Sequence, residues 1–123
     1  MSSALDANTL LEAALAYSGG SHTVDDVLGM IERGEAQRWD GPNSIVVTEI
    51  DRQPHKTYLL FFLAAGRKDE LLAMQEGIFA WGREQGCDAA RLVGRKGWAR
   101  SFLTDHGWQD TQYVILENDL HGR

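Results

Sequence analysis

The sequence contains one cysteine, two prolines and no long hydrophobic run. Cys87 has no second cysteine with which to form an internal disulfide, which is typical of a reducing compartment, so we expect it to be a small buried apolar side chain. No apolar run approaches the ~20 residues that a membrane-spanning helix needs, and we expect no membrane partner. The first residues have neither a basic region nor an apolar core, which predicts no secretion signal.

The sequence also lacks the patterns of a metal site and of a nucleic-acid-binding surface. Its four histidines, at positions 22, 55, 106 and 121, do not have metal-ligand spacing, so we expect no metal. The net charge of −6 disfavours binding to nucleic acid or anionic membranes by the surface as a whole. What remains is 43% hydrophobic and 24% charged over 123 residues, which predicts one globular domain spanning 1–123.

The order of hydrophobic patterns predicts an α/β fold with a mixed sheet. Helical periodicity predicts helices at 4–17, from Thr23 to Gly34, at 69–85 and at 96–106. Runs of β-branched and apolar residues predict strands at 45–50, 57–65, 89–93 and 111–117. The order is therefore α-α-β-β-α-β-α-β. Two of the strands, joined by the long helix, form a central parallel βαβ unit in this prediction.

Basic residues gather where the last predicted helix begins. Arg95 and Lys96 lie at its N-terminus, where positive charge is disfavoured, and Arg91 and Arg100 are nearby in the sequence. One interpretation is a docking patch for an acidic protein surface, a phosphate or nucleic acid, although the net charge makes nucleic acid the less favoured partner. The other is that these residues form ion pairs with the chain's own carboxylates.

The C-terminal part of the sequence resembles the GNAT N-acetyltransferase superfamily, and the element order resembles that superfamily without its first strand. Many members close with an alanine, a tyrosine four positions later and Gly-Phe four positions after that. Ala99, Leu103 and Gly107-Trp108 fall on these positions. The run 94–100 followed by Gly107-Trp108 is also similar to short GNAT-like proteins of tailed bacteriophages and prophages. The resemblance covers residues 20–118.

The resemblance implies an acetyl-CoA site, but the residues at that site depart from the family pattern. The superfamily binds the pyrophosphate with a Gln/Arg-x-x-Gly-x-Gly/Ala loop before the long helix, where backbone N–H groups and the helix N-terminus meet the phosphates. The corresponding segment here is 64–70. If acetyl-CoA binds, the resemblance assigns it to Gly66, Arg67 and Lys68. Asp69 and Glu70 then place two carboxylates where an anion would dock.

The general acid and base of the family are also not matched. Leu103 replaces the tyrosine that donates a proton to the thiolate in many members, and leucine has no proton to give. Glu49 lies on a strand that borders the cleft in the family. It is a candidate base if burial raises its pKa, and otherwise it is a solvated strand residue.

Two functions follow from this pattern. The first is a GNAT-like domain of phage or prophage origin without acetyl-CoA chemistry, acting as a structural or interaction protein in the bacterial cytoplasm or the virion. Its partner would be another phage protein or a second copy in a homo-oligomer, and it would need no cofactor. The alternative is an acetyl-CoA-dependent N-acyltransferase with a noncanonical phosphate loop.

Overall fold

The computed structural model of the chain describes residues 6–94 and 103–121. The chain divides into two compact units, 1–93 and 94–123, and each is described by itself. Of the described helices, none combines the length and the apolar character that crossing a bilayer requires. The first unit contains the sheet and the main helices.

A four-stranded mixed sheet forms the centre of the first unit, with the strand order β1-β2-β3-β4. Its strands are β1 (Gln37–Asp40), β2 (Ile45–Arg52), β3 (Thr57–Ala65) and β4 (Ala89–Leu92). β2 pairs antiparallel with both β1 and β3, whereas β4 runs parallel to β3. A parallel neighbour requires a crossover, and the long helix between β3 and β4 supplies it.

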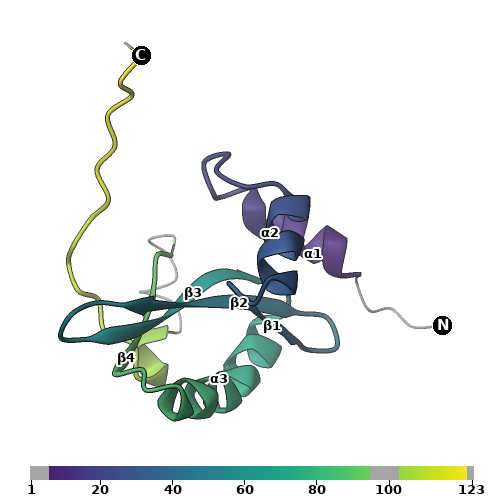
Figure 1. Cartoon of the computed structure of the whole chain (residues 1–123). Helices are drawn as coiled ribbons and strands as arrows, with labels where there is room; N and C mark the ends of the chain where they lie inside the picture. Colours follow the sequence, from purple (N-terminus) through teal and green to yellow (C-terminus); the bar gives the residue numbers. More distant parts are fainter. Residues whose placement is uncertain (1–5, 95–102, 122–123) are drawn as a thin grey trace. The chain divides into compact units, whose positions relative to one another are not determined.

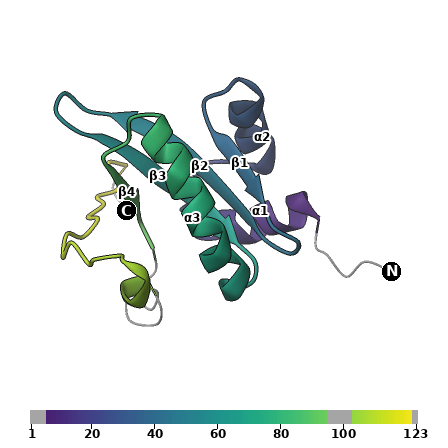
Figure 2. The ribbon, with the colours of Figure 1, turned by 90° about the horizontal axis from the view of Figure 1, so that it is seen from below.

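Helices cover both faces of this sheet. α1 (Ala7–Leu15) and α2 (Val24–Glu32) lie on one face, and α3 (Lys68–Glu84) lies on the other (Figure 1). Figure 2, viewed from the α3 side, shows α3 running diagonally across the strands. The alternation of side chains along β2 explains the two layers, because Val46 faces α3 while Ile45 and Val47 face α1 and α2.

Each layer has its own apolar core. On the α1 and α2 side, Leu11, Val27 and Leu63 pack with the inward residues of β2. On the α3 side, Ile78 packs against Leu59, with half-buried aromatic side chains around them. Cys87, expected to be a small buried apolar residue, packs against the core on the α3 side and is half-buried.

The coarse α/β prediction with a mixed sheet is confirmed, and so is the parallel pairing of β3 with β4. The strand at 37–40 was not predicted. It holds only one apolar side chain, Trp39, between Arg38 and Asp40, so its sequence lacks a strand pattern. Its partner β2 specifies it instead, through an antiparallel register that pairs Trp39 with Val46.

The second unit contains a short 3₁₀ turn, Thr104–His106, which Gly107 ends in the left-handed conformation. Most of the helix predicted at 96–106 lies outside the described residues. The strand predicted at 111–117 is not formed: this segment has no regular secondary structure, and Tyr113 is 85% exposed. A strand needs a hydrogen-bonding neighbour, and the second unit by itself contains no described strand to supply one.

Candidate functional site

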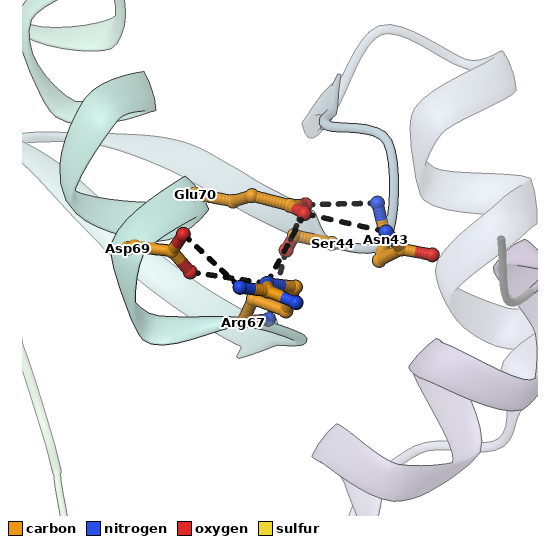
Figure 3. Close-up of polar contacts among 5 residues, drawn as sticks. All are labelled: Asn43, Ser44, Arg67, Asp69 and Glu70. Carbon is orange, nitrogen blue, oxygen red and sulfur yellow. Dashed lines mark hydrogen bonds and ion pairs between the residues drawn. The ribbon is translucent and has the colours of Figure 1, made fainter. Parts of the chain in front are cut away.

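The N-terminus of α3, where the resemblance places the pyrophosphate, meets the loop between β1 and β2. Figure 3 shows the Glu70 side chain directed toward this loop. Its Oε1 accepts hydrogen bonds from the Asn43 backbone N–H at 2.8 Å and from Ser44 Oγ at 2.7 Å. The Arg67 backbone N–H donates to Ser44 Oγ at 3.0 Å. The Arg67 and Asn43 N–H groups and the Ser44 hydroxyl are therefore bound to groups of the chain itself.

The positive charge at this helix start is also paired internally. Arg67 Nε lies 3.2 Å from Asp69 Oδ1 and 3.7 Å from Glu70 Oε2 (Figure 3). These contacts stabilise both carboxylates. The hydrogen bonds from Ser44 and Asn43 lower the pKa of Glu70, and the Arg67 guanidinium lowers the pKa of Asp69. Both acids are therefore ionised at neutral pH, and their charge repels a second anion.

Gly66 has a structural role where β3 meets α3. It adopts φ = +127°, a region nearly restricted to glycine. A Cβ on this residue would lie 2.3 Å from Ser44 Oγ and 2.4 Å from the Asn43 carbonyl oxygen. The missing side chain thus lets β3 turn into α3 directly beneath the loop between β1 and β2. The close approach that Gly66 permits is made by Asn43 and Ser44 of the chain itself.

The three residues assigned to acetyl-CoA therefore lie together, as expected from their positions in the sequence. Gly66 contacts the loop, Arg67 pairs with the two acids, and Lys68 is the first residue of α3. Asn43 and Ser44, which complete the cluster, were not predicted. Their only signal in the sequence was the turn pattern Asp40-Gly41-Pro42-Asn43.

A pocket of about 160 Å³ opens where β2, β3 and β4 adjoin. Its lining is mostly apolar and comprises Glu49, Leu60, Phe61, Phe62, Arg91, Leu92 and Val93. Glu49 is half-buried in it. Burial raises the pKa of the Glu49 carboxyl, with nearby His22 opposing the shift and Asp51 reinforcing it. A raised pKa is what a general base requires, so the pocket keeps Glu49 as a candidate.

Two residues that line this pocket, Phe62 and Arg91, contact rings outside the lining. The His22 ring meets the Phe62 ring edge-on, with centroids 4.9 Å apart. The Arg91 guanidinium lies 3.9 Å from the centre of the Tyr58 ring, a cation–π geometry. Arg91 is thus engaged with its own sheet. Arg95, Lys96 and Arg100, the rest of the predicted docking patch, lie outside the described residues.

The pairing of β3 with β4 stops before β3 ends. The register runs from Tyr58 with Ala89 to Phe61 with Leu92, whereas β3 continues to Ala65. A register shift also interrupts the pairing of β2 with β3, between Val47 and Thr48, which leaves Phe62 without an opposite residue in β2. The last residues of β3 are therefore unpaired with β4, next to the pocket.

Position 103 offers no general acid, and the described residues hold no candidate metal cluster. Leu103 directly precedes the 3₁₀ turn and carries no titratable group. Within the described ranges, no three His, Cys, Asp or Glu side chains gather as metal ligands would. Proton transfer to a leaving group would therefore need a group other than the residue at position 103.

No model of a known protein family matches the sequence, and no curated protein is significantly similar to it. Among solved structures, the fold is similar to two crystal structures of the protein TTHA1254 from Thermus thermophilus. A point variant of that protein superposes with a TM-score of 0.63 at 16% identity, covering 92% of each chain. The wild type gives 0.61 at 16% identity, covering 85% of this chain and 86% of the other. At this identity the likeness shows the fold alone.

Proposed function

We propose that this chain is a GNAT-like domain that binds a protein partner and does not bind acetyl-CoA. The observation that supports the proposal is the position of Glu70, whose carboxylate accepts from the Asn43 N–H and from Ser44 Oγ. A pyrophosphate at a helix N-terminus needs free donors and an excess of positive charge. Glu70 is itself an anion and already occupies the donors of the facing loop.

The charges around the site support the same conclusion. Arg67 forms ion pairs with Asp69 and Glu70, so its guanidinium is neutralised before any ligand arrives. The Glu70 side chain is only 16% exposed and is held from two directions. Admitting a pyrophosphate would require this carboxylate to leave its hydrogen bonds or become protonated, and its lowered pKa opposes protonation at neutral pH.

Isothermal titration calorimetry with acetyl-CoA tests the proposal. We expect no saturable heat from the wild-type protein, and saturable binding at micromolar concentrations would overturn the proposal. The double substitution Asp69→Asn/Glu70→Gln removes both charges while keeping side chains of the same size. If the two carboxylates exclude the ligand, this variant gains weak binding of acetyl-CoA.

The matched control is Glu76→Gln/Glu84→Gln, which removes two exposed carboxylates farther along the same helix. This control changes the net charge by the same amount, so it separates a local effect from a general one. Equal binding by both double variants would show that net charge alone decides. If the wild type and the Asp69/Glu70 variant both fail to bind, the function stands but the electrostatic explanation is wrong.

The pocket beside Glu49 favours a second candidate, an N-acyltransferase with a noncanonical phosphate site. The half-buried carboxyl with a raised pKa supports this candidate, as does the early end of the pairing between β3 and β4. An amine acceptor would then lose its proton to Glu49. The test is an assay of acetyl-CoA turnover with small amines, in which the release of the CoA thiol is measured. Any turnover must fall sharply in Glu49→Gln while Asp51→Asn retains it.

Origin and location are proposed on the resemblance of residues 94–100 and 107–108 to phage and prophage proteins. On that basis we place the chain in the cytoplasm of a bacterial host or in a virion, as a structural or assembly protein. Mass spectrometry of purified particles tests the second location. If the chain is present in the particles in stoichiometric amounts, it is a virion component. If it is absent from them, it acts only in the cell.

A further inference from the structure

One row of side chains crosses three neighbouring strands of the sheet and carries charges of opposite sign at its two ends. Glu49 of β2 lies opposite Leu60 of β3, and Leu60 lies opposite Arg91 of β4. Residues opposite each other in paired strands project from the same face of a sheet. This is the face on which α1 and α2 pack, because Val47, two residues before Glu49, belongs to their core. The row therefore presents a carboxylate, an apolar side chain and a guanidinium in that order.

The two charges of this row are held apart. Neighbouring strands lie about 4.8 Å from each other, so the backbones of β2 and β4 are separated by about 10 Å. The Arg91 guanidinium lies over β3, 3.9 Å from the centre of the Tyr58 ring. A cation–π contact engages the flat face of a guanidinium, and its N–H groups, which lie in the plane, remain directed toward an acceptor. Among the described residues of the first unit, no ion pair joins Glu49 to Arg91.

The pocket that these residues line sets the size of a ligand. Its volume is about 160 Å³, and its lining lies wholly within the first unit. A cavity of about this volume accommodates a body of about six non-hydrogen atoms, the size of benzene. Leu60 lies between the two charges, and Phe62 and Val93 extend the apolar surface. A ligand that fits this pocket is therefore apolar in its middle and much smaller than a nucleotide or acetyl-CoA.

The environment of Glu49 favours a cation at that end of the row. Burial in the mostly apolar lining raises the pKa of the Glu49 carboxyl, with His22 opposing the shift and Asp51 reinforcing it. The ionised carboxylate is therefore less stable here than in water. An ammonium group beside it would offset this cost, because it supplies both an opposite charge and hydrogen-bond donors.

We propose that this pocket binds a small zwitterion whose ammonium and carboxylate groups are separated by an aliphatic chain, as in an ω-amino acid. The ammonium pairs with Glu49, the aliphatic chain lies on Leu60, and the carboxylate accepts hydrogen bonds from Arg91. An α-amino acid carries its two charges too close together to reach both outer strands. The inference goes beyond the proposed function, because it assigns a small ligand rather than a protein partner and requires no acyl transfer.

The experiment is an NMR titration of the isotope-labelled full chain at pH 7, with 6-aminohexanoate as the probe. We expect saturable shifts of the backbone amides of β2, β3 and β4 around the row. Hexylamine and hexanoate each keep one of the two charges. Both should bind at least about 10-fold more weakly, because each loses one charge-assisted contact. Alanine, a zwitterion too short to reach both ends, should give no saturable shift.

Two substitutions assign the ends of the ligand. Glu49→Gln should weaken the binding of 6-aminohexanoate about 10-fold and should not weaken that of hexanoate. Arg91→Gln should also weaken the binding of 6-aminohexanoate about 10-fold, but it should not weaken that of hexylamine. The matched controls are Glu76→Gln and Arg83→Gln, at exposed residues of α3 on the other face of the sheet. Both controls should bind 6-aminohexanoate as the wild type does.

Three results would overturn the inference. The absence of saturable shifts with 6-aminohexanoate would exclude the site. Equal affinities for 6-aminohexanoate and for either singly charged analogue would show that the second charge is not recognised. Full retention of binding by both Glu49→Gln and Arg91→Gln would place the ligand elsewhere. The analogues remove each charge from the ligand instead of the protein, so the comparison holds even if a variant does not fold. Calorimetry with acetyl-CoA tests the proposed function separately, and neither result determines the other.

Discussion

Substituting Gly66 by alanine should destabilise the protein strongly. Gly66 has φ = +127°, and an L-residue in this region costs about 1–3 kcal/mol of the free energy of unfolding. The new Cβ would also lie 2.3 Å from Ser44 Oγ and 2.4 Å from the Asn43 carbonyl oxygen. Moving that loop is a form of overpacking, which costs about a further 1–3 kcal/mol. The total loss is about 2–6 kcal/mol, a large part of the ~5–15 kcal/mol that stabilises a typical domain.

The assay is equilibrium unfolding in urea, followed by tryptophan fluorescence, with Gly77→Ala as the matched control. Gly77 lies inside α3, and apart from its chain neighbours and the helix's own backbone no described atom lies within 4 Å of the Cβ it would gain. Alanine there favours the helix, so we expect a gain of about 0.5–1 kcal/mol in stability. Gly82 is the intermediate case, because its Cβ would lie 2.8 Å from Leu59 Cδ2, the flexible end of a side chain.

The signs of these changes decide the interpretation. A neutral or stabilising Gly66→Ala would refute the close packing of the loop between β1 and β2 against the start of α3. It would also reopen the possibility that Gly66 is a phosphate-loop glycine that leaves space for a ligand. A destabilising Gly77→Ala would show that an unseen neighbour meets α3 at that position.

The other predictions concern the carboxylates of Glu70 and Glu49 and the hydrogen bond of Trp39 in the sheet. Because Glu70 has a lowered pKa in the folded state, its stabilising effect is present above pH 4.5 and is lost as pH falls through the lowered pKa. Glu70→Gln should therefore have a lower thermal midpoint than the wild type at pH 7. The difference between the two midpoints should become smaller in acid. Glu49 has a raised pKa, so its ionisation opposes folding once pH rises above 4.5. Glu49→Gln should raise the thermal midpoint at pH 7 and have no effect well below pH 4.5. Trp39→Phe removes the hydrogen bond from Nε1 to Thr48 Oγ1, 3.1 Å long, and should cost about 1–3 kcal/mol by urea unfolding. If Glu70→Gln or Glu49→Gln has the same thermal midpoint as the wild type across the pH range, the pKa shift given for that residue is refuted.

The elements that the sequence predicts well are those with a strong local pattern. The capping box of α2 is present: Thr23 Oγ1 accepts from the Asp26 N–H and the Asp26 carboxylate accepts from the Thr23 N–H. α3 begins and ends within a residue of the predicted bounds, 69–85. The strand at 57–65 matches its prediction in full. In each case the determining residues are neighbours in sequence, so their periodicity is sufficient.

The elements that the sequence misses depend on distant partners. β1 has a polar sequence and is a strand only because β2 lies beside it. The predicted strand at 111–117 has an excellent local pattern but no described strand in its own unit to pair with. Propensity favours a strand, whereas pairing decides whether one forms, so the two errors have a single cause.

The site shows the same dependence on distance, and it changes the meaning of the two acids at the start of α3. From the sequence, Asp69 and Glu70 interact with the positive end of the helix. The structure directs Glu70 toward Ser44, which precedes it by 26 residues. A bound anion can replace a carboxylate that only complements the helix dipole, because both interact with the same partial positive charge at the helix N-terminus. A carboxylate that also holds a loop in place is not, since its displacement costs the loop its hydrogen bonds. The case against acetyl-CoA at this position therefore rests on tertiary contacts rather than on charge alone.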